Sequence, residues 1–73
     1  MIGITEEVWD GLTIAERTYL TKCELEYLDI EDETVDKAIS VLKEHLNMNT
    51  YTFTTEEMDI IAEATTIMEE NME

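Results

Sequence analysis

The lack of proline constrains this chain more than any other feature of its sequence. There is no proline, and the only glycines, Gly3 and Gly11, lie near the amino terminus. Proline and glycine are the residues that most strongly interrupt helices, so no residue beyond position 11 forces a helix to break. The helix boundaries must therefore be located from capping residues and from the spacing of apolar side chains.

A capping box predicts the start of the last helix. Thr54 precedes Glu57 by three residues, the spacing at which each side chain accepts a hydrogen bond from the other residue's backbone N–H. Phe53 and Met58 flank this box at the spacing of a hydrophobic staple. We expect a helix from Thr55 to about Glu70, with an apolar face formed by Ile60, Ile61, Ala64, Ile67 and Met68.

A second capping box, Thr13 with Glu16, predicts a helix that ends near Leu28. The apolar residues of this helix are expected to form one buried stripe along it. Cys23 belongs to that stripe, so it is expected to be a buried, unreactive thiol. The spacing of apolar residues predicts that this stripe consists of Ala15, Tyr19, Leu20, Cys23 and Tyr27.

A third helix is expected after Asp32, which is a suitable N-cap, and Asn47 and Asn49 suit its carboxyl end. Before the three helices, residues 5–9 predict one helical turn that ends at Asp10 and Gly11. The apolar face of the third helix is predicted to contain Val35, Ala38, Ile39, Leu42 and Leu46.

These elements predict an all-α fold, a small bundle of three main helices plus a short N-terminal helical turn. Residues 2–5 and 51–54 alternate apolar and polar side chains, so a minor two-stranded ribbon is an alternative at those places. A chain of 73 residues buries only about 60% of its unfolded surface, so residues 1–73 are expected to form one domain. A homodimer that covers further apolar surface is an open alternative.

The residues that could carry chemistry are few. Cys23 is the single cysteine, which excludes an internal disulfide and a cysteine-based zinc site and suits a reducing cytoplasm. The alternating acids Asp29, Glu31 and Glu33 are spaced as in a calcium loop of the EF-hand type. The sixth position of that loop is Thr34 where glycine is needed, and its twelfth is Ser40 where glutamate is needed. We expect no metal site and no cofactor.

Catalysis is also not expected. A nucleophile would have to be Cys23, Ser40 or a threonine working with His45, the only histidine, and no spacing brings such residues together. His45 is expected in the last turn of its helix, where the helix dipole favours a cation. Ser40 lies inside a predicted helix without a preceding aspartate, so the chain lacks the serine motif of acyl carrier proteins.

Acidic residues dominate the charge. The chain has nineteen Asp and Glu and only four basic residues, which gives a formal net charge of −15. The basic residues are Arg17, Lys22, Lys37 and Lys43. Nucleic acids and anionic membranes are bound by basic side chains, so direct binding to either is disfavoured and a basic protein partner is expected. No apolar run is long enough to cross a membrane, so we expect an unanchored cytoplasmic protein.

Not all of these acids need a function. Those in the first turns of helices are stabilised by the helix dipole. Others lie near helix ends that favour cations, and between Glu24 and Asp36 there are seven acids and no Lys or Arg. Because such repulsion costs stability, the partner-binding residues are predicted among these acids, namely Glu24, Glu26, Asp29, Glu31, Asp32, Asp36, Glu63, Glu69 and Glu70.

The charge density indicates a function. A compact chain of this length has a diameter of about 29 Å, which gives one net charge per about 2 Å, against one per about 1.7 Å of duplex DNA. The leading hypothesis is therefore an inhibitor or decoy that mimics nucleic-acid charge and blocks a basic nucleic-acid-binding protein, as a virus-encoded antagonist of host machinery would. The alternative is a helical adaptor or homodimerisation module that binds through an apolar helix face bearing Trp9, Tyr51, Phe53, Met58 or Met68.

Overall fold

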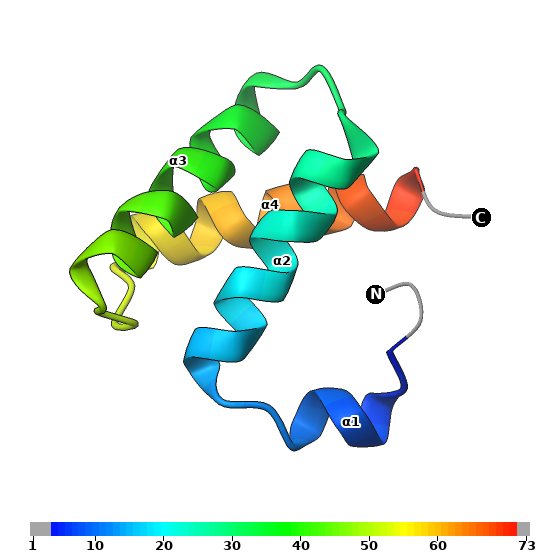
Figure 1. The fold of residues 1–73 in the computed structure, drawn as a ribbon. Helices are drawn as coiled ribbons and strands as arrows, with labels where there is room; N and C mark the ends of the chain where they lie inside the picture. The colour runs from blue at the N-terminus through cyan, green and yellow to red at the C-terminus, as the bar shows by residue number, and fades with distance from the viewer. Residues whose placement is uncertain (1–3, 72–73) are drawn as a thin grey trace.

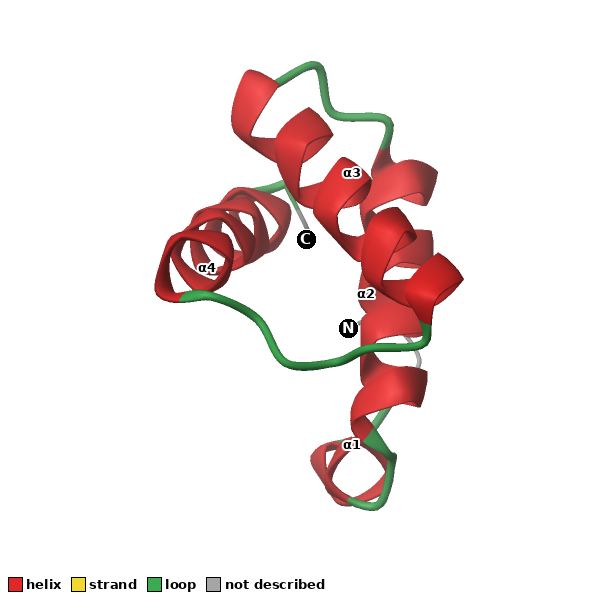
Figure 2. Ribbon diagram, turned by 90° about the vertical axis from the view of Figure 1, so that its left-hand side faces the viewer, coloured by secondary structure: helices red, strands yellow, loops and turns green. Residues whose placement is uncertain are grey.

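The computed structural model describes residues 4–71, which form four helices and no strand (Figure 1). Helix α1 spans Glu6–Asp10, α2 spans Ile14–Leu28, α3 spans Glu33–Met48 and α4 spans Thr55–Glu70. The predicted all-α architecture of three main helices and a short N-terminal one is confirmed. Figure 2 shows α2 and α3 on one side of the molecule and α4 on the other, with α1 at the N-terminal end of α2.

Both predicted capping boxes are present. The backbone N–H of Glu16 donates to Thr13 Oγ1 at 3.2 Å, and Thr13 N–H donates to Glu16 Oε1 at 3.0 Å. The same pair of bonds joins Thr54 and Glu57, at 3.1 and 2.9 Å. Each box thus bonds two backbone N–H groups at the start of the helix, which explains why α2 and α4 begin where the sequence predicts.

The carboxyl ends of α2 and α3 are closed by residues in the left-handed region of the backbone. Asp29 has a φ of 47° and Asn49 a φ of 55°. Asn and Asp tolerate this conformation better than other residues with side chains. The predicted exit of the third helix at Asn49 is confirmed.

The core lies where α2, α3 and α4 meet. The faces predicted for the third and fourth helices contribute five of its fully buried residues, and Ile39, Ile60, Ile61 and Ile67 pack around them. Burial of these side chains removes apolar surface from water, which is the main stabilising contribution. The fully buried apolar residues are Leu25, Val35, Ala38, Leu42, Ala64 and Met68.

The prediction that the apolar stripe of α2 with Tyr19, Cys23 and Tyr27 is buried is wrong. Tyr19 is 55% exposed and Tyr27 79% exposed, and Cys23 is only half-buried. The buried residues of α2 are Thr18 and Leu25, which lie on the other side of the helix. A threonine can take a core position there because the Thr18 hydroxyl donates to the Ile14 carbonyl at 2.8 Å and leaves no polar group unsatisfied.

The predicted two-stranded ribbon is not supported by the described residues. Residues 51–54 form an irregular loop between α3 and α4, and residues 2 and 3 lie outside the described part of the chain. Among the helices of residues 4–71, none is both long and apolar enough to span a membrane.

Candidate partner-binding surfaces

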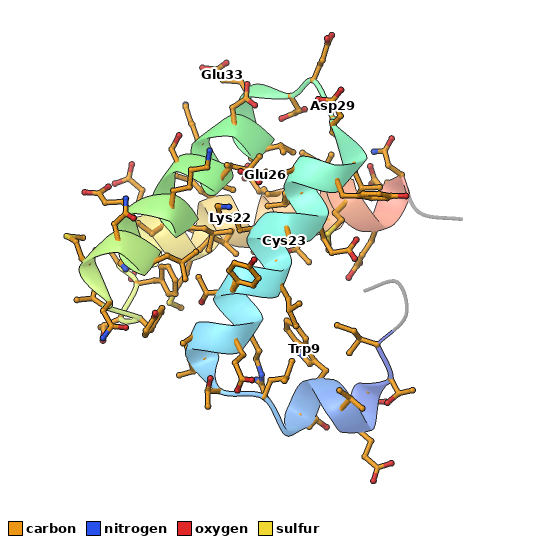
Figure 3. The ribbon with its side chains drawn as sticks, viewed as in Figure 1. Trp9, Lys22, Cys23, Glu26, Asp29 and Glu33 are labelled. Atoms are coloured by element: carbon orange, nitrogen blue, oxygen red, sulfur yellow. The ribbon has the colours of Figure 1, made fainter. Side chains whose placement is uncertain are left out.

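Arg17 is used to hold α1 against α2. Its Nε donates to the Trp9 carbonyl at 3.1 Å and its Nη2 donates to the Asp10 carbonyl at 3.0 Å. The guanidinium carbon also lies 5.4 Å from the centre of the Trp9 ring, within the range of a cation–π contact. Figure 3 shows the Trp9 side chain directed from α1 toward the rest of the molecule.

The three lysines each pair with a carboxylate of the chain itself. Lys22 and Lys43 both bind Glu26, with Nζ–O distances of 3.3 and 3.2 Å. Lys37 lies 3.6 Å from Glu33 in an exposed pair. Hydrogen bonding from Lys43 lowers the pKa of Glu26, and Lys22 adds to this effect. Among the acids of residues 24–36, only Glu26 and Glu33 therefore form an ion pair with a described lysine.

Three of the predicted partner-binding acids come together where α2 ends and α3 begins. Glu26, Asp29 and Asp36 line one recess of about 240 Å³, together with Lys43. Figure 3 shows Glu26 on the side of α2 that faces α3, and Asp29 at the end of α2. Of these acids Glu26 is bound by two lysines, whereas Asp29 and Asp36 form no ion pair with any residue between positions 4 and 71. The negative charge of this recess is therefore carried by Asp29 and Asp36.

The other acids of residues 24–36 have different surroundings. Glu31 is exposed in the connection between α2 and α3. Asp32 caps α3, because its carboxylate accepts a hydrogen bond from Thr34 N–H at 2.8 Å. Glu24 is half-buried, and its Oε2 is buried without a hydrogen-bond partner among the described residues. Of these three, only Glu31 is exposed and forms no hydrogen bond or ion pair with a described residue.

The predicted acids of α4 divide between two sides of the helix. Glu69 lines a groove of about 480 Å³ between α1 and α4, together with Glu6. Glu63 and Glu70 instead share one side of α4 with two further exposed acids, because residues three, four or seven apart lie on the same side of a helix. We call this set the α4 acidic stripe, which consists of Glu56, Asp59, Glu63 and Glu70.

An apolar groove of about 340 Å³ lies between the first half of α2 and the end of α3. Its lining includes Tyr19 and Leu20, which the sequence places in the core, together with Leu46 and Tyr51. We call the surface between α2 and α3 the α2–α3 seam. Its apolar end consists of Tyr19, Leu20, Leu46 and Tyr51, and its acidic end consists of Glu26, Asp29 and Asp36. The stripe of α2 that was predicted to be core thus borders an open groove.

The apolar residues predicted to bind a partner in the adaptor hypothesis differ in how exposed they are. Met68 is 3% exposed and belongs to the core, so it is unavailable to a partner. Phe53 packs against the core and its ring lies 4.3 Å from that of His45. Trp9 is half-buried beneath Arg17, whereas Met58 is 56% exposed.

His45 and Glu57 form a part-buried ion pair that the sequence does not predict. His45 Nε2 lies 3.0 Å from Glu57 Oε2, and His45 Nδ1 lies 3.0 Å from the Thr50 carbonyl. The hydrogen bond with Glu57 raises the pKa of His45, and the Thr50 carbonyl adds to this. The Thr54 backbone N–H and then His45 lower the pKa of Glu57. The pair connects α3 to α4 and is a structural feature.

No group of three or more His, Cys, Asp or Glu in residues 4–71 is arranged to hold a metal ion. In particular, Asp29, Glu31 and Glu33 do not converge. Comparisons of the chain with protein-family models, with curated proteins and with solved structures found no match.

Proposed function

We propose that this protein is an acidic inhibitor or decoy that binds the basic surface of a nucleic-acid-binding protein and blocks access of the nucleic acid. The observation that carries the proposal is that Arg17 and the three lysines all bond to other groups of the same chain. Arg17 holds α1, Lys22 and Lys43 share Glu26, and Lys37 pairs with Glu33. The exposed acids elsewhere, including the α4 acidic stripe, therefore present a field that is almost entirely negative.

The dimensions of the molecule support the comparison with duplex DNA. Its longest extent is 32 Å, and its radius of gyration is 11.7 Å. A net charge of −15 over 32 Å gives one charge per about 2 Å, against one per about 1.7 Å of DNA axis. Arg and Lys side chains that bind phosphates bind carboxylates by similar charge-assisted hydrogen bonds. A cytoplasmic location and a viral origin are compatible parts of this proposal.

The decisive experiment is capture of partners from a cytoplasmic lysate on the immobilised protein, followed by elution with rising salt or with duplex DNA. We expect bound proteins that elute with moderate salt, that are displaced by DNA, and that bind DNA themselves. The triple variant Asp59→Lys, Glu63→Lys, Glu70→Lys should capture much less of them. A matched variant with the same net charge, Glu6→Lys, Glu7→Lys, Asp10→Lys, tests whether the face matters. Capture that is insensitive to both salt and DNA would contradict the proposal.

A further inference from the structure

We propose that the α2–α3 seam docks a basic segment of the partner protein, and that this segment carries a large apolar side chain at one end and Arg or Lys residues at the other. The inference rests on the proposed function only for the positive charge of the partner. It adds an apolar contact and a defined surface, which charge mimicry alone does not require.

The two ends of the seam follow the same side of α2. On α2, Tyr19, Lys22, Glu26 and Asp29 follow one another at intervals of three, four and three residues. Such residues lie along one side of a helix. Tyr19 lines the apolar groove, Lys22 bonds to Glu26, and Glu26 and Asp29 line the acidic recess.

The same spacing occurs on α3 in the opposite order. Asp36, Ile39 and Lys43 line the acidic recess, and Leu46, three residues after Lys43, lines the apolar groove. The groove of about 340 Å³ and the recess of about 240 Å³ are two separate hollows along the same pair of helices, and the ion pair between Lys43 and Glu26 crosses between these helices at the recess.

The charge of the seam favours a basic occupant, because three acids, Glu26, Asp29 and Asp36, line its acidic end together with one cation, Lys43. At its acidic end Asp29 and Asp36 form no ion pair with a described residue, so a bound segment gains by placing cations there. At its apolar end the 55% exposed Tyr19 can bury further surface against an aliphatic or aromatic side chain. A second copy of this chain is a poor occupant, because it carries a net charge of −15 and its own seam has the same acidic end.

The length of the seam limits the partner. Tyr19 on α2 and Asp29, which directly follows the last residue of α2, are ten residues apart, and this corresponds to about 15 Å at the rise of a helix. The apolar anchor and the basic residues of the partner must span a similar distance. A helical segment does so in about ten residues, and an extended segment in about five.

The test is selection of a displayed library of random 16-residue peptides on the immobilised whole protein at low salt. We expect enriched peptides that combine one large apolar residue with two or more basic residues at a separation that spans the seam. A synthetic peptide of the enriched sequence should lose about tenfold or more in affinity with Tyr19→Ala, and a similar factor with the double variant Asp29→Asn, Asp36→Asn. The matched double variant Asp59→Asn, Glu63→Gln removes the same charge from α4 and should change the affinity by less than about twofold.

Each other outcome is decisive. Enriched peptides that are basic without an apolar residue, or that respond equally to the seam and α4 variants, overturn the docking surface and leave the proposed function standing. Apolar peptides without basic residues that require Tyr19 contradict the basic segment and overturn the docking surface, whereas the proposed function fails only if capture of partners is insensitive to both salt and DNA. No enrichment over the protein carrying Tyr19→Ala would also overturn the docking surface. Circular dichroism of each variant, all at exposed positions, verifies that the helices are retained.

Discussion

The imidazole of His45 and the carboxylate of Glu57 fasten the end of α3 to the start of α4, with Nε2 and Oε2 3.0 Å apart. Glu57 uses its other oxygen to cap α4, and His45 Nδ1 faces the Thr50 carbonyl at 3.0 Å. A carboxylate and a carbonyl are both acceptors, so both ring nitrogens can donate only when the imidazole is protonated. The Thr50 hydroxyl, 3.3 Å from Nδ1, can instead donate to a neutral ring, and it is the hydrogen bond with Glu57 that raises the pKa of His45 and favours the imidazolium.

Because of this pair, we expect the stability of the folded protein to depend on pH. The pKa of His45 is raised above its ordinary value of 6.5. Its contribution to the stability of the fold is therefore complete below pH 6.5 and is lost as the pH rises through the raised pKa. The pKa of Glu57 is lowered below 4.5, so its contribution is present above 4.5 and is lost as the pH falls through the lowered pKa. The pair should stabilise most between about pH 4.5 and 6.5.

Thermal unfolding of Glu57→Gln measures this dependence. The difference in Tm from the unmodified protein should be largest between about pH 4.5 and 6.5 and should decrease at higher pH. Glu16→Gln is the matched control, because Glu16 serves the same kind of capping box without a histidine. The pKa of Glu16 is lowered by the Thr13 backbone N–H, so its effect should persist above pH 4.5 without a later decrease. A Glu57→Gln difference that stays constant from pH 5.5 to 8.5 would show that His45 does not titrate with the pair.

The helix boundaries could be predicted because they depend on residues close in sequence. Capping boxes act over three residues, so Thr13 and Thr54 locate the starts of α2 and α4 without knowledge of the tertiary structure. The inner face of α2 could not be predicted in this way. The helix carries apolar residues on two sides, and packing selects the side of Thr18 and Leu25, where a hydroxyl bonded to its own helix is tolerated.

The contacts between helices could also not be predicted from the sequence. The bond between His45 and Glu57 depends on the path of the loop from residue 49 to residue 54, and the bond from Lys43 to Glu26 depends on the packing of α2 against α3. Neither pair has a regular sequence spacing. Of the acids predicted to bind a partner, Glu24 and Glu26 therefore have surroundings within the fold that only the structure reveals, whereas Asp32 caps α3 as its position in the sequence predicts.

Substitution of leucines on the two sides of α2 tests which side is buried. Leu25→Ala should lower the free energy of unfolding by about 2–5 kcal/mol, because Leu25 is 1% exposed and belongs to the core. A core this small supplies only about 3–5 kcal/mol, so much of the variant should be unfolded at 25 °C. Leu20→Ala should cost about 1 kcal/mol or less, because Leu20 is half-buried beside an open groove. Urea unfolding followed by circular dichroism gives both values, and equal losses would contradict the assignment.

Replacement of Arg17 should release α1 without unfolding the other helices. Arg17→Lys keeps the charge but loses the planar group that bonds the Trp9 and Asp10 carbonyls together. Trp9 is the only tryptophan, so its fluorescence reports on α1 alone. We expect emission at longer wavelength as the ring meets more water, with nearly unchanged helicity and Tm. Glu16→Gln, which leaves these bonds intact, is the control, and an unshifted emission for Arg17→Lys would show that other contacts hold α1.

Substitution of Asp29 should increase stability and weaken partner binding at the same time. Its φ of 47° favours glycine, and its charge lies at the carboxyl end of α2, where the helix dipole disfavours an anion. Asp29→Gly removes both costs and should raise the free energy of unfolding by about 0.5–1 kcal/mol. Asn49→Gly is the matched control, because Asn49 has the same backbone conformation at the end of α3 and carries no charge. Asn49→Gly also removes the hydrogen bond that Tyr51 Oη donates to Asn49 Oδ1 at 3.1 Å, so it should stabilise less than Asp29→Gly. If Asp29→Gly leaves affinity for the enriched peptide unchanged, the acid at position 29 does not serve the α2–α3 seam.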